Sequence, residues 1–316
     1  MKYAILGKTD IKVSELCFGT LPMGPLQANL SPEDGGKLIR QALEMGVNFI
    51  DTAQSYKTYE HISRGIEGFS GDLVITSKSM AEDYEGMEKA IQGALKSLKR
   101  DVIDIFHLHA AMSSTDVFQK REQAFKCLLD YKQKGYIRAV GIATHDVEVV
   151  ELASTMSEID IVYPLINKKS RGILKGNAQD MIKAINKCHE AGKGTYAMKV
   201  LAGGNLVGDL LDAVKFARNI DGIHAVSMGI INSNELELNV KIFNGEITSQ
   251  AMLPDLENTK KIFVAFLCKK CGLCMEACPN EALSMGDGDR AVVDHEKCIL
   301  CGYCYPVCPE FAIRMI

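Results

Sequence analysis

Two copies of one cysteine pattern constrain the C-terminal end of the chain more than any other feature of the sequence. The copies read Cys268-x-x-Cys271-x-x-Cys274-x-x-x-Cys278-Pro279 and Cys298-x-x-Cys301-x-x-Cys304-x-x-x-Cys308-Pro309. The chain has 316 residues and eleven cysteines, and eight of the cysteines belong to these two copies. Cysteines that cluster in this way in a reducing compartment bind metal rather than form disulfides.

The spacing within each copy suits a pair of four-iron clusters. Three thiolates separated by two residues wrap one corner of a cubane, and the fourth, after a longer step and before a proline, ligates the other cluster. We therefore expect one cluster on Cys268, Cys271, Cys274 and Cys308, and a second on Cys298, Cys301, Cys304 and Cys278. Zinc also binds Cys-x-x-Cys pairs, but it needs only four ligands and does not explain the run of three thiolates before the proline.

The similarity of the two copies continues beyond the cysteines. Residues 279–283, Pro-Asn-Glu-Ala-Leu, match residues 309–313, Pro-Glu-Phe-Ala-Ile, and Met285 matches Met315. This two-fold repeat resembles the bacterial two-cluster ferredoxins, which implies a small α+β domain with two [4Fe-4S] clusters. The other three cysteines stand alone in apolar or helical surroundings, and we expect small buried side chains at Cys17, Cys127 and Cys188.

The overall composition excludes several classes of partner. The formal net charge is −4, and no run of Lys and Arg favours nucleic acid or an anionic membrane surface. No apolar stretch approaches the length of a bilayer span, and the first ten residues reach charged side chains too early for a signal peptide. We expect a cytoplasmic protein that binds neither nucleic acid nor a membrane.

Upstream of the cysteines, apolar strand patterns alternate with helical patterns. After a short N-terminal hairpin, strands are predicted at 15–18, 47–50, 73–76, 103–108, 139–142, 160–165, 195–198 and 223–226. Eight strands, each followed by a helix, have the size and order of a TIM barrel. A doubly wound open sheet is the alternative, but no Gly-x-Gly-x-x-Gly follows an early strand to support it.

These patterns divide the chain into three parts. We expect a (β/α)8 TIM barrel of the α/β class over residues 1–244 and a ferredoxin-like domain over residues 262–316. The regular alternation ends near Asn244, and residues 245–261 are predicted as a linker or a terminal helix.

Four side chains with acid–base chemistry lie at or just after the ends of three predicted barrel strands. Asp51 closes the second strand, Lys78 follows the third, His109 ends the fourth, and Tyr56 lies five residues past Asp51. Taken one at a time, Asp51 is explained as a helix cap, Lys78 as a solvated charge and His109 as a hydrogen-bonded barrel histidine. Because catalytic groups of a β/α barrel lie at the C-terminal ends of its strands, the set together favours one catalytic site.

The motifs around these residues resemble the aldo/keto reductases over roughly residues 1–243. The segments 51–56, 76–78 and 104–109 match that family's tetrad of Asp, Tyr, Lys and His, and segments 18–20 and 135–141 match its first- and fifth-strand signatures. The resemblance implies that Tyr56 donates a proton while a nicotinamide delivers a hydride to a carbonyl carbon. The implied substrate is a small carbonyl or alcohol.

Charge alone gives these four residues consistent roles. A tyrosine with a pKa near 10 is a poor acid or base at neutral pH unless a nearby cation favours its anion. Lys78 supplies that cation, Asp51 holds Lys78, and His109 orients the carbonyl oxygen. His107, two residues away on the same strand, is the second candidate for the orienting role.

The resemblance also predicts the nicotinamide contacts, several of which depart from the family's usual residues. The predicted contacts are Gly19, Thr20, Thr144, His145, Asn167, Lys199, Ser227, Gly229, Asn232, Glu235 and Asn239. His145 stands where the family has an asparagine, Lys199 where it has a stacking tyrosine, and Lys57 where a glycine follows the catalytic tyrosine. Glu235 replaces an arginine that pairs with a 2′-phosphate, and a carboxylate there favours NAD(H) over NADP(H).

Three functions fit this combination of domains. The leading hypothesis is an iron–sulfur oxidoreductase whose electrons pass through the clusters, with a protein as its redox partner. The alternatives are an electron carrier with a non-catalytic barrel as a docking platform, and a nicotinamide carbonyl reductase whose clusters only brace the fold. The ferredoxin part replaces the segment that closes over the barrel mouth in the resembled family. We therefore expect it near the active site, with one cluster closer to Tyr56.

Overall fold

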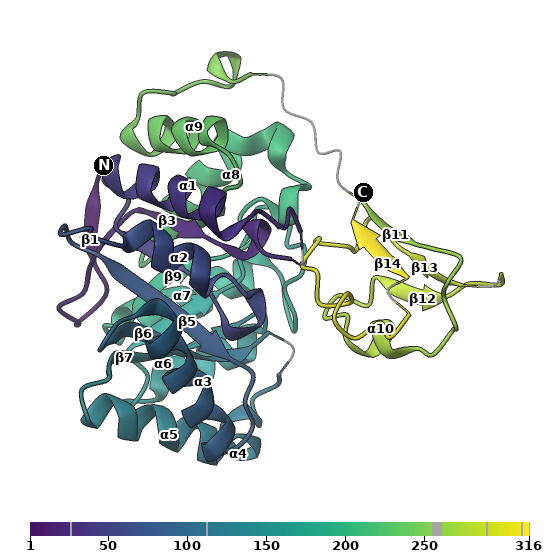
Figure 1. Cartoon of the computed structure of the whole chain (residues 1–316), viewed down its shortest axis with the longest axis horizontal. Helices are drawn as coiled ribbons and strands as arrows, with labels where there is room; N and C mark the ends of the chain where they lie inside the picture. The colour runs from purple at the N-terminus through teal and green to yellow at the C-terminus, as the bar shows by residue number, and fades with distance from the viewer. Residues whose placement is uncertain (26, 112, 255–260, 289, 311, 316) are drawn as a thin grey trace.

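Eight parallel strands form a closed barrel in the N-terminal part of the protein (Figure 1). The computed structural model describes residues 1–25, 27–111, 113–254, 261–288, 290–310 and 312–315. In order around the barrel the strands are β3 (Leu16–Gly19), β4 (Phe49–Asp51), β5 (Val74–Ser79), β6 (Ile103–Ala110), β7 (Ile137–Thr144), β8 (Ile161–Pro164), β9 (Gly194–Ala197) and β10 (Ala225–Gly229). Each predicted strand overlaps one of these strands. The predicted TIM barrel is therefore confirmed, and the alternative, a doubly wound open sheet, is wrong.

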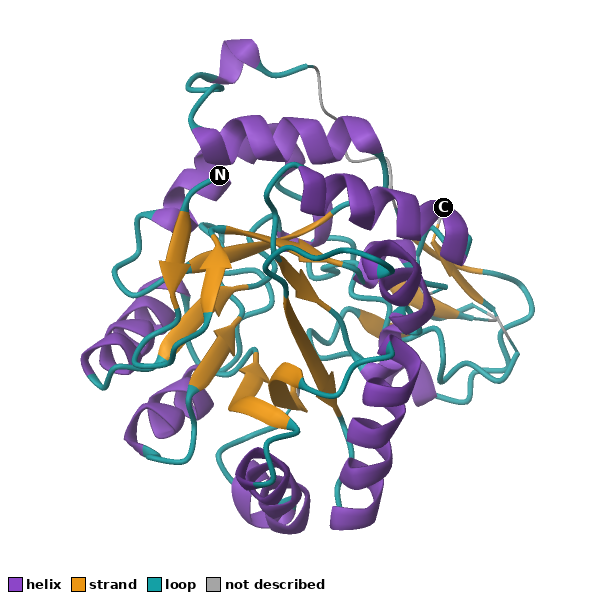
Figure 2. Cartoon of the chain, turned by 60° about the vertical axis from the view of Figure 1, so that its left-hand side comes forward, coloured by secondary structure: helices purple, strands orange, loops and turns teal. Residues whose placement is uncertain are grey.

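Helices surround the barrel strands, as Figure 2 shows. They are α1 (Pro32–Glu44), α2 (Tyr59–Ile66), α3 (Tyr84–Leu98), α4 (Val117–Lys120), α5 (Glu122–Gln133), α6 (Val147–Thr155), α7 (Ala178–Glu190), α8 (Leu210–Arg218) and α9 (Ser233–Asn244). Helix α1 begins where the sequence predicts, because the Ser31 hydroxyl accepts a hydrogen bond from the Asp34 backbone N–H and Pro32 occupies the first turn. Its buried face packs against the barrel.

The barrel interior is a packed core that is closed at both ends by segments outside the barrel strands. At the N-terminal end of the strands, the hairpin of β1 (Tyr3–Ile5) and β2 (Lys12–Ser14) buries Leu6 and Ile11. At the opposite end, Ile299 and Cys301 of the ferredoxin-like part belong to the same hydrophobic cluster. The interior is therefore continuous from the hairpin to the cysteine-rich domain.

The C-terminal domain is small and has its own core (Figure 1). It pairs β11 (Ile262–Val264) with β14 (Ile313–Met315), and β12 (Leu283–Met285) with β13 (Ala291–Val293), each pair antiparallel. One short helix, α10 (Leu273–Glu276), lies in the first cysteine copy. Of the predicted linker, residues 250–252 form a short 3-10 turn, and residues 255–260 lie outside the described residues.

The small domain docks on the C-terminal mouth of the barrel through residues 296–304, which we call the docking loop. The polar contacts are hydrogen bonds from Asn205 Nδ2 to Cys298 O (2.9 Å) and from Gln27 Nε2 to Leu300 O (3.3 Å), and an Arg171–Glu296 ion pair (2.8 Å). The expectation that the ferredoxin part lies near the active site is therefore confirmed.

Close backbone contact fixes the docking loop in place. Gly203 has a φ of 71°, in the left-handed region, and a Cβ atom at this position would lie 1.7 Å from the carbonyl oxygen of Ile299. Only glycine tolerates both the conformation and the contact. The Ile299 side chain is 1% exposed, so the loop is inserted into the barrel mouth rather than resting on its surface.

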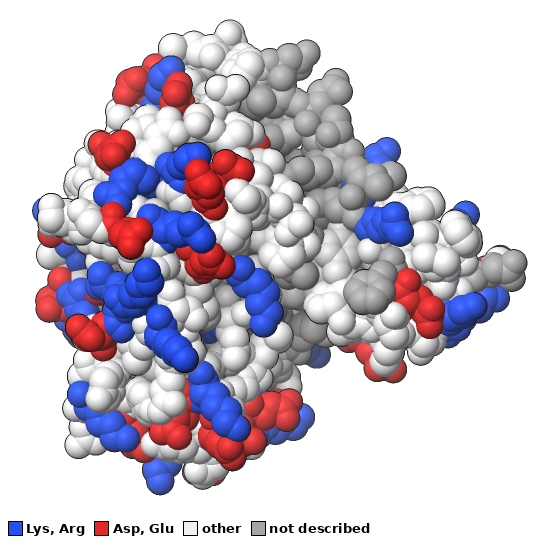
Figure 3. All heavy atoms as spheres, in the orientation of Figure 1, with Lys and Arg blue, Asp and Glu red and all other residues white. Residues whose placement is uncertain are grey.

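Charges on the barrel surface are mixed in sign. Figure 3 shows Lys and Arg side chains beside Asp and Glu over the barrel helices. Several form pairs one helical turn apart, such as Lys37–Glu33 and Lys89–Glu85. Within the described residues, no helix is long and apolar enough to cross a membrane.

Candidate active site

The four predicted catalytic residues meet at the C-terminal mouth of the barrel. Asp51 is the last residue of β4, Lys78 lies near the end of β5, and His109 lies near the end of β6. Tyr56 ends the short 3-10 turn η2 (Gln54–Tyr56), which follows β4. Parallel strands in register bring their C-terminal ends to one rim, and this places the four side chains together.

Lys78 and Asp51 form a buried ion pair. Lys78 Nζ donates to Oδ1 and Oδ2 of Asp51 at 2.7 and 2.9 Å, and to the backbone oxygen of Thr52 at 2.8 Å. Burial raises the pKa of the Asp51 carboxyl and lowers the pKa of the Lys78 ammonium, although each charge opposes the shift of its partner. The three oxygen acceptors hold the ammonium in one position.

Tyr56 lies next to this ion pair without a hydrogen bond to it. Lys78 Nζ is 4.7 Å from the centroid of the Tyr56 ring, and in the described part of the chain the Tyr56 hydroxyl has no hydrogen-bond partner. Burial raises the pKa of Tyr56 well above its ordinary value, and the nearby Tyr303 and Asp51 add to the shift. The sequence predicts that Lys78 favours the phenolate, but in this geometry burial dominates and the phenol keeps its proton. Lys57 stands directly after Tyr56, where the family usually has a glycine. Its backbone φ is 58°, in the left-handed region that favours glycine.

His109 contacts a residue that the sequence analysis missed. Its Nε2 lies 3.1 Å from the hydroxyl of Tyr303, which belongs to the docking loop and follows two residues after Cys301. Burial and then the Lys78 charge lower the pKa of His109 well below its ordinary value, so the imidazole is neutral. His107 does not share this position, because its Nε2 pairs with the Tyr196 hydroxyl at 2.7 Å inside the barrel.

A cavity of ≈ 420 Å³ extends from the tetrad toward α9, and its size is typical of cofactor and small-molecule sites. Asp51 and Tyr56 line one part of it, and Leu300 of the docking loop lines another. Of the predicted nicotinamide contacts, six line this cavity: Gly19, Lys199, Ser227, Gly229, Glu235 and Asn239. The buried Oδ1 of Asn239 has no partner among the described residues, which suits a polar ligand there. These residues fit a nicotinamide cofactor, and their individual contacts stay predictions.

The other predicted nicotinamide contacts are not among the residues that line the cavity. The Thr20 hydroxyl donates to the Asp51 backbone oxygen, and the Asn167 side chain is occupied by the backbone of Arg171, Lys169 and Lys199. Thr144 accepts from the Asp146 N–H, and Asn232 caps α9 by accepting from the Glu235 N–H. His145 is fully buried, neither ring nitrogen has a partner among the described residues, and burial lowers its pKa to about 3.

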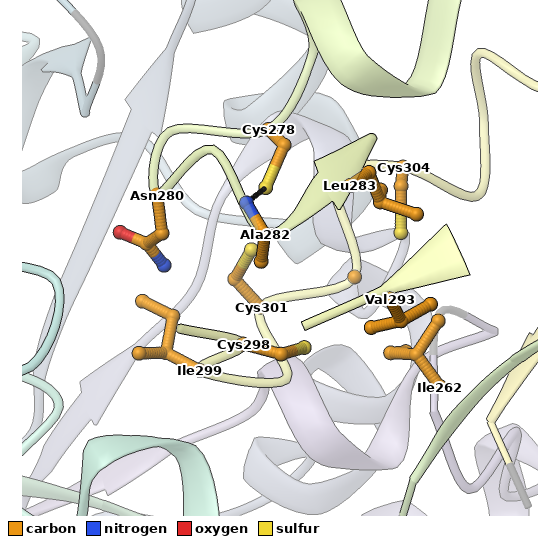
Figure 4. A pocket seen from close by; sticks show the side chains of 11 residues that line it. Ile262, Cys278, Asn280, Ala282, Leu283, Val293, Cys298, Ile299, Cys301 and Cys304 are labelled. Carbon is orange, nitrogen blue, oxygen red and sulfur yellow. Dashed lines mark hydrogen bonds between the residues drawn. The ribbon is translucent and has the colours of Figure 1, made fainter. Parts of the chain in front are cut away.

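The eight clustered cysteines separate into the two predicted sets of four. Cys278, Cys298, Cys301 and Cys304 surround one small cavity, whose side chains Figure 4 shows. Cys268, Cys271, Cys274 and Cys308 surround another. Among the described residues, no His, Cys, Asp or Glu side chains converge closely enough to hold a single metal ion. Each set of four cysteines lines one small cavity, and four thiolates are the ligand set of a [4Fe-4S] cluster.

Backbone N–H groups point at the sulfurs in equivalent places of the two copies. The Ala282 N–H donates to Cys278 Sγ at 3.3 Å, and the Ala312 N–H donates to Cys308 Sγ at 3.3 Å. Such hydrogen bonds stabilise thiolates and tune cluster potentials. The second set, with Cys298 and Cys301 in the docking loop, is the one that faces the barrel, whereas Cys271 of the first set is exposed.

The fold and the site together define an oxidoreductase that carries iron–sulfur clusters. The sequence profile of the aldo/keto reductase family matches residues 15–222, and that of the 4Fe-4S dicluster domain matches residues 267–314. The chain therefore belongs to the aldo/keto reductase family, in a fusion with a ferredoxin-like domain.

Characterised relatives are distant. The chain is 24% identical to methylglyoxal reductase DkgA of Escherichia coli K12 over 191 residues, which cover 57% of this chain and 67% of that protein. It is 29% identical to L-galactose dehydrogenase of Arabidopsis thaliana over 43% of this chain and 46% of the relative. An aldo-keto reductase structure from Pseudomonas aeruginosa matches 77% of this chain and 94% of its own, at a TM-score of 0.65 and 24% identity. That structural likeness supports the fold.

Proposed function

We propose that this oxidoreductase interconverts a small carbonyl compound and its alcohol, with Tyr56 as the general acid/base and electrons carried by two [4Fe-4S] clusters. The observation that carries the proposal is the convergence of three features on one mouth of the barrel. These are the buried Asp51–Lys78 pair, the protonated Tyr56 beside it, and the cavity that Asp51 and Tyr56 line.

Tyr56 is the group that donates a proton to the substrate oxygen. Reduction of a carbonyl needs two electrons and two protons, and one of the protons ends on that oxygen. Because burial raises the pKa of Tyr56, its phenol holds a proton at neutral pH. The phenol is therefore in the protonated form that the reduction direction requires. The Lys78 ammonium, 4.7 Å from the ring centroid, stabilises the negative charge that develops on the phenol oxygen.

Two kinds of cofactor fit the residues around this acid. The two cysteine sets would hold iron–sulfur clusters, which supply electrons one at a time. The six predicted contacts that line the cavity, among them Gly19 and Asn239, would hold a nicotinamide, which supplies a hydride. Residues of the chain position the substrate against both. Leu300 of the docking loop lines the cavity together with Lys199 and Tyr56, and Leu300 precedes Cys301 of the barrel-facing set in the sequence.

The test is turnover of a carbonyl probe by anaerobically prepared protein with intact and with removed clusters, with NADH or with dithionite as the two-electron reductant. Methylglyoxal is the first probe, because a relative is named as a methylglyoxal reductase. We expect Tyr56→Phe to lower turnover by roughly 10² to 10⁴. The exposed Tyr136→Phe is the matched control. Turnover that survives cluster removal would favour a nicotinamide carbonyl reductase whose clusters only brace the fold. A wild-type protein without turnover would favour an electron carrier whose barrel is a docking platform.

A further inference from the structure

The docking loop supplies an aromatic side chain to the barrel's active site. Tyr303 stands between Cys301 and Cys304 in the sequence, so its backbone is part of the segment that borders the barrel-facing cysteine set. Its hydroxyl lies 3.1 Å from Nε2 of His109, a residue 194 positions away in the chain. Its ring meets the His109 ring edge to face, at a centroid distance of 6.1 Å.

Two phenols from two domains pack against the ring of His109. Tyr56 lies edge to face, at a centroid distance of 6.2 Å and an interplanar angle of 85°. Tyr303 meets the same ring at 6.1 Å. A substrate oxygen bound at Tyr56 therefore lies beside the imidazole that Tyr303 also contacts.

Two proton arrangements fit the contact between His109 and Tyr303. Nδ1 of His109 is buried and has no partner among the described residues, so a proton on Nδ1 leaves that N–H unsatisfied even when a substrate is bound. With the proton on Nε2, His109 donates to the oxygen of Tyr303, and the O–H of Tyr303 is free to donate to another acceptor. A substrate oxygen supplies that acceptor, so a bound substrate satisfies every donor only in this second arrangement.

Resting on the proposed function, we propose that Tyr303 donates the hydrogen bond that orients the substrate oxygen, and that His109 acts through Tyr303. The orienting role that the sequence analysis assigned to His109 then passes to a residue of the cluster-binding domain. The substrate oxygen receives one hydrogen bond from Tyr56, which transfers the proton, and one from Tyr303, which does not.

Contacts with the barrel hold the docking loop, and with it Tyr303, in one position. The Asn205 amide holds the backbone at Cys298, and the buried Ile299 and the contact at Gly203 fix the next residue. The phenol is thus carried on a segment that is anchored a few residues away. A donor that is fixed before the substrate arrives needs no reorganisation during the reaction.

The test compares Tyr303→Phe with Tyr305→Phe in the full-length, cluster-loaded protein. Tyr305 lies two residues further along, next to Cys304, and its buried hydroxyl has no partner in the described part of the chain. Both variants lose one hydroxyl beside the same cysteine set. We expect Tyr303→Phe to lower kcat/KM for methylglyoxal by about 10². Tyr305→Phe should stay within about twofold of the wild type, because its hydroxyl has no contact to lose.

A double-variant cycle separates a direct role of His109 from a role through Tyr303. If His109 acts through the phenol, His109→Gln should lower kcat/KM in the wild-type background and change it little in the Tyr303→Phe background. An equal loss in both backgrounds would show that His109 contacts the substrate itself. A rise in kcat/KM in Tyr303→Phe would show that the phenol blocks the substrate. Either result would overturn the proposal.

An electron paramagnetic resonance measurement tests the contact without turnover. Hydroxyacetone, an alcohol product of methylglyoxal reduction, is added to dithionite-reduced protein without nicotinamide. Because Tyr303 lies between two cysteines of one set, we expect the cluster signal to shift in the wild type and in Tyr305→Phe, but not in Tyr303→Phe. A wild type that shows the shift but no turnover would remove the proposed function and keep the Tyr303 contact. An unchanged wild-type signal would overturn the contact.

Discussion

Nζ of Lys78 lies within 2.9 Å of both carboxylate oxygens of Asp51, and each of the two side chains is at most 4% exposed. Removal of one partner from a buried ion pair leaves the other charge without compensation, which costs ~3–5 kcal/mol. We therefore expect Lys78→Met to lower both turnover and the free energy of unfolding, the latter measured by denaturant titration. Adding Asp51→Asn should restore part of the stability.

A surface pair in the same protein provides the control for that variant. Lys37 and Glu33 lie one turn apart on α1, at 2.7 Å, with side chains about 70% exposed. Exposed pairs of this kind are screened by solvent and contribute little to stability, so Lys37→Met should leave the unfolding transition almost unchanged. Equal losses in Lys78→Met and Lys37→Met would contradict the importance of burial.

Metal content tests the assignment of the two cysteine sets. Anaerobically prepared protein should hold about eight irons and as many acid-labile sulfides per chain, from two cubanes. Cys271→Ser changes a ligand of the exposed set, so it should remove about half of the iron and leave the barrel-facing cluster. Iron and sulfide assays with spin quantitation measure this. Stoichiometric zinc with little iron would refute the cluster assignment.

The choice between the two nicotinamide cofactors depends on Glu235. Its Oε2 accepts a hydrogen bond from the N–H of Ile231, which lies just before α9, and Glu235 lines the cavity. A carboxylate held there repels a 2′-phosphate, so NAD(H) should bind more tightly than NADP(H). Titration of both dinucleotides measures the ratio of their dissociation constants. Glu235→Gln should bring the two dissociation constants closer together. Clearly tighter NADPH in the wild type would refute the prediction.

His145 makes the stability of the barrel depend on pH. Burial lowers its pKa to about 3 in the folded protein, against an ordinary value of ~6.5 in the unfolded chain. As the pH falls below ~6.5, the unfolded state therefore binds a proton that the folded state does not, and stability is lost until the pH reaches about 3. At pH 5 this loss amounts to ~2 kcal/mol.

The variant His145→Asn isolates that contribution. Denaturant titrations at pH 8 and pH 5 should show a smaller difference in stability for His145→Asn than for the wild type. The same substitution at the exposed His295 controls for the general effect of acid on the clusters and the surface. If both variants lose as much stability as the wild type between the two pH values, the buried histidine does not contribute.

The elements that the sequence predicted well are those encoded by local repetition. The barrel follows from strand and helix periods that recur eight times, and the cluster ligands follow from cysteine spacing. Asp51, Lys78 and His109 were found because the C-terminal ends of parallel strands share one rim.

Features that depend on the docking of the two domains could not be predicted in detail. Nothing local in the sequence relates Tyr303 to His109, because their contact depends on how the docking loop meets the barrel mouth. The available signals were a tyrosine between two ligand cysteines and the pair Gly203-Gly204 after β9, which permits close backbone approach. The sequence also predicts that Lys78 favours the phenolate of Tyr56. In the structure burial of Tyr56 raises its pKa, so the phenol keeps its proton despite the nearby Lys78.

The contact between Gly203 and Ile299 limits how this protein can be recombined. A cut in the stretch 245–261 separates the two domains in the sequence, but it leaves Ile299 in the barrel core and Tyr303 beside His109. A ferredoxin from another source, joined at that cut, would present a different loop to a mouth shaped for this one. Exchange of electron-carrying modules on this barrel therefore requires grafting residues 296–304 into the incoming module, so that the barrel's Gly203 meets the loop that it fits.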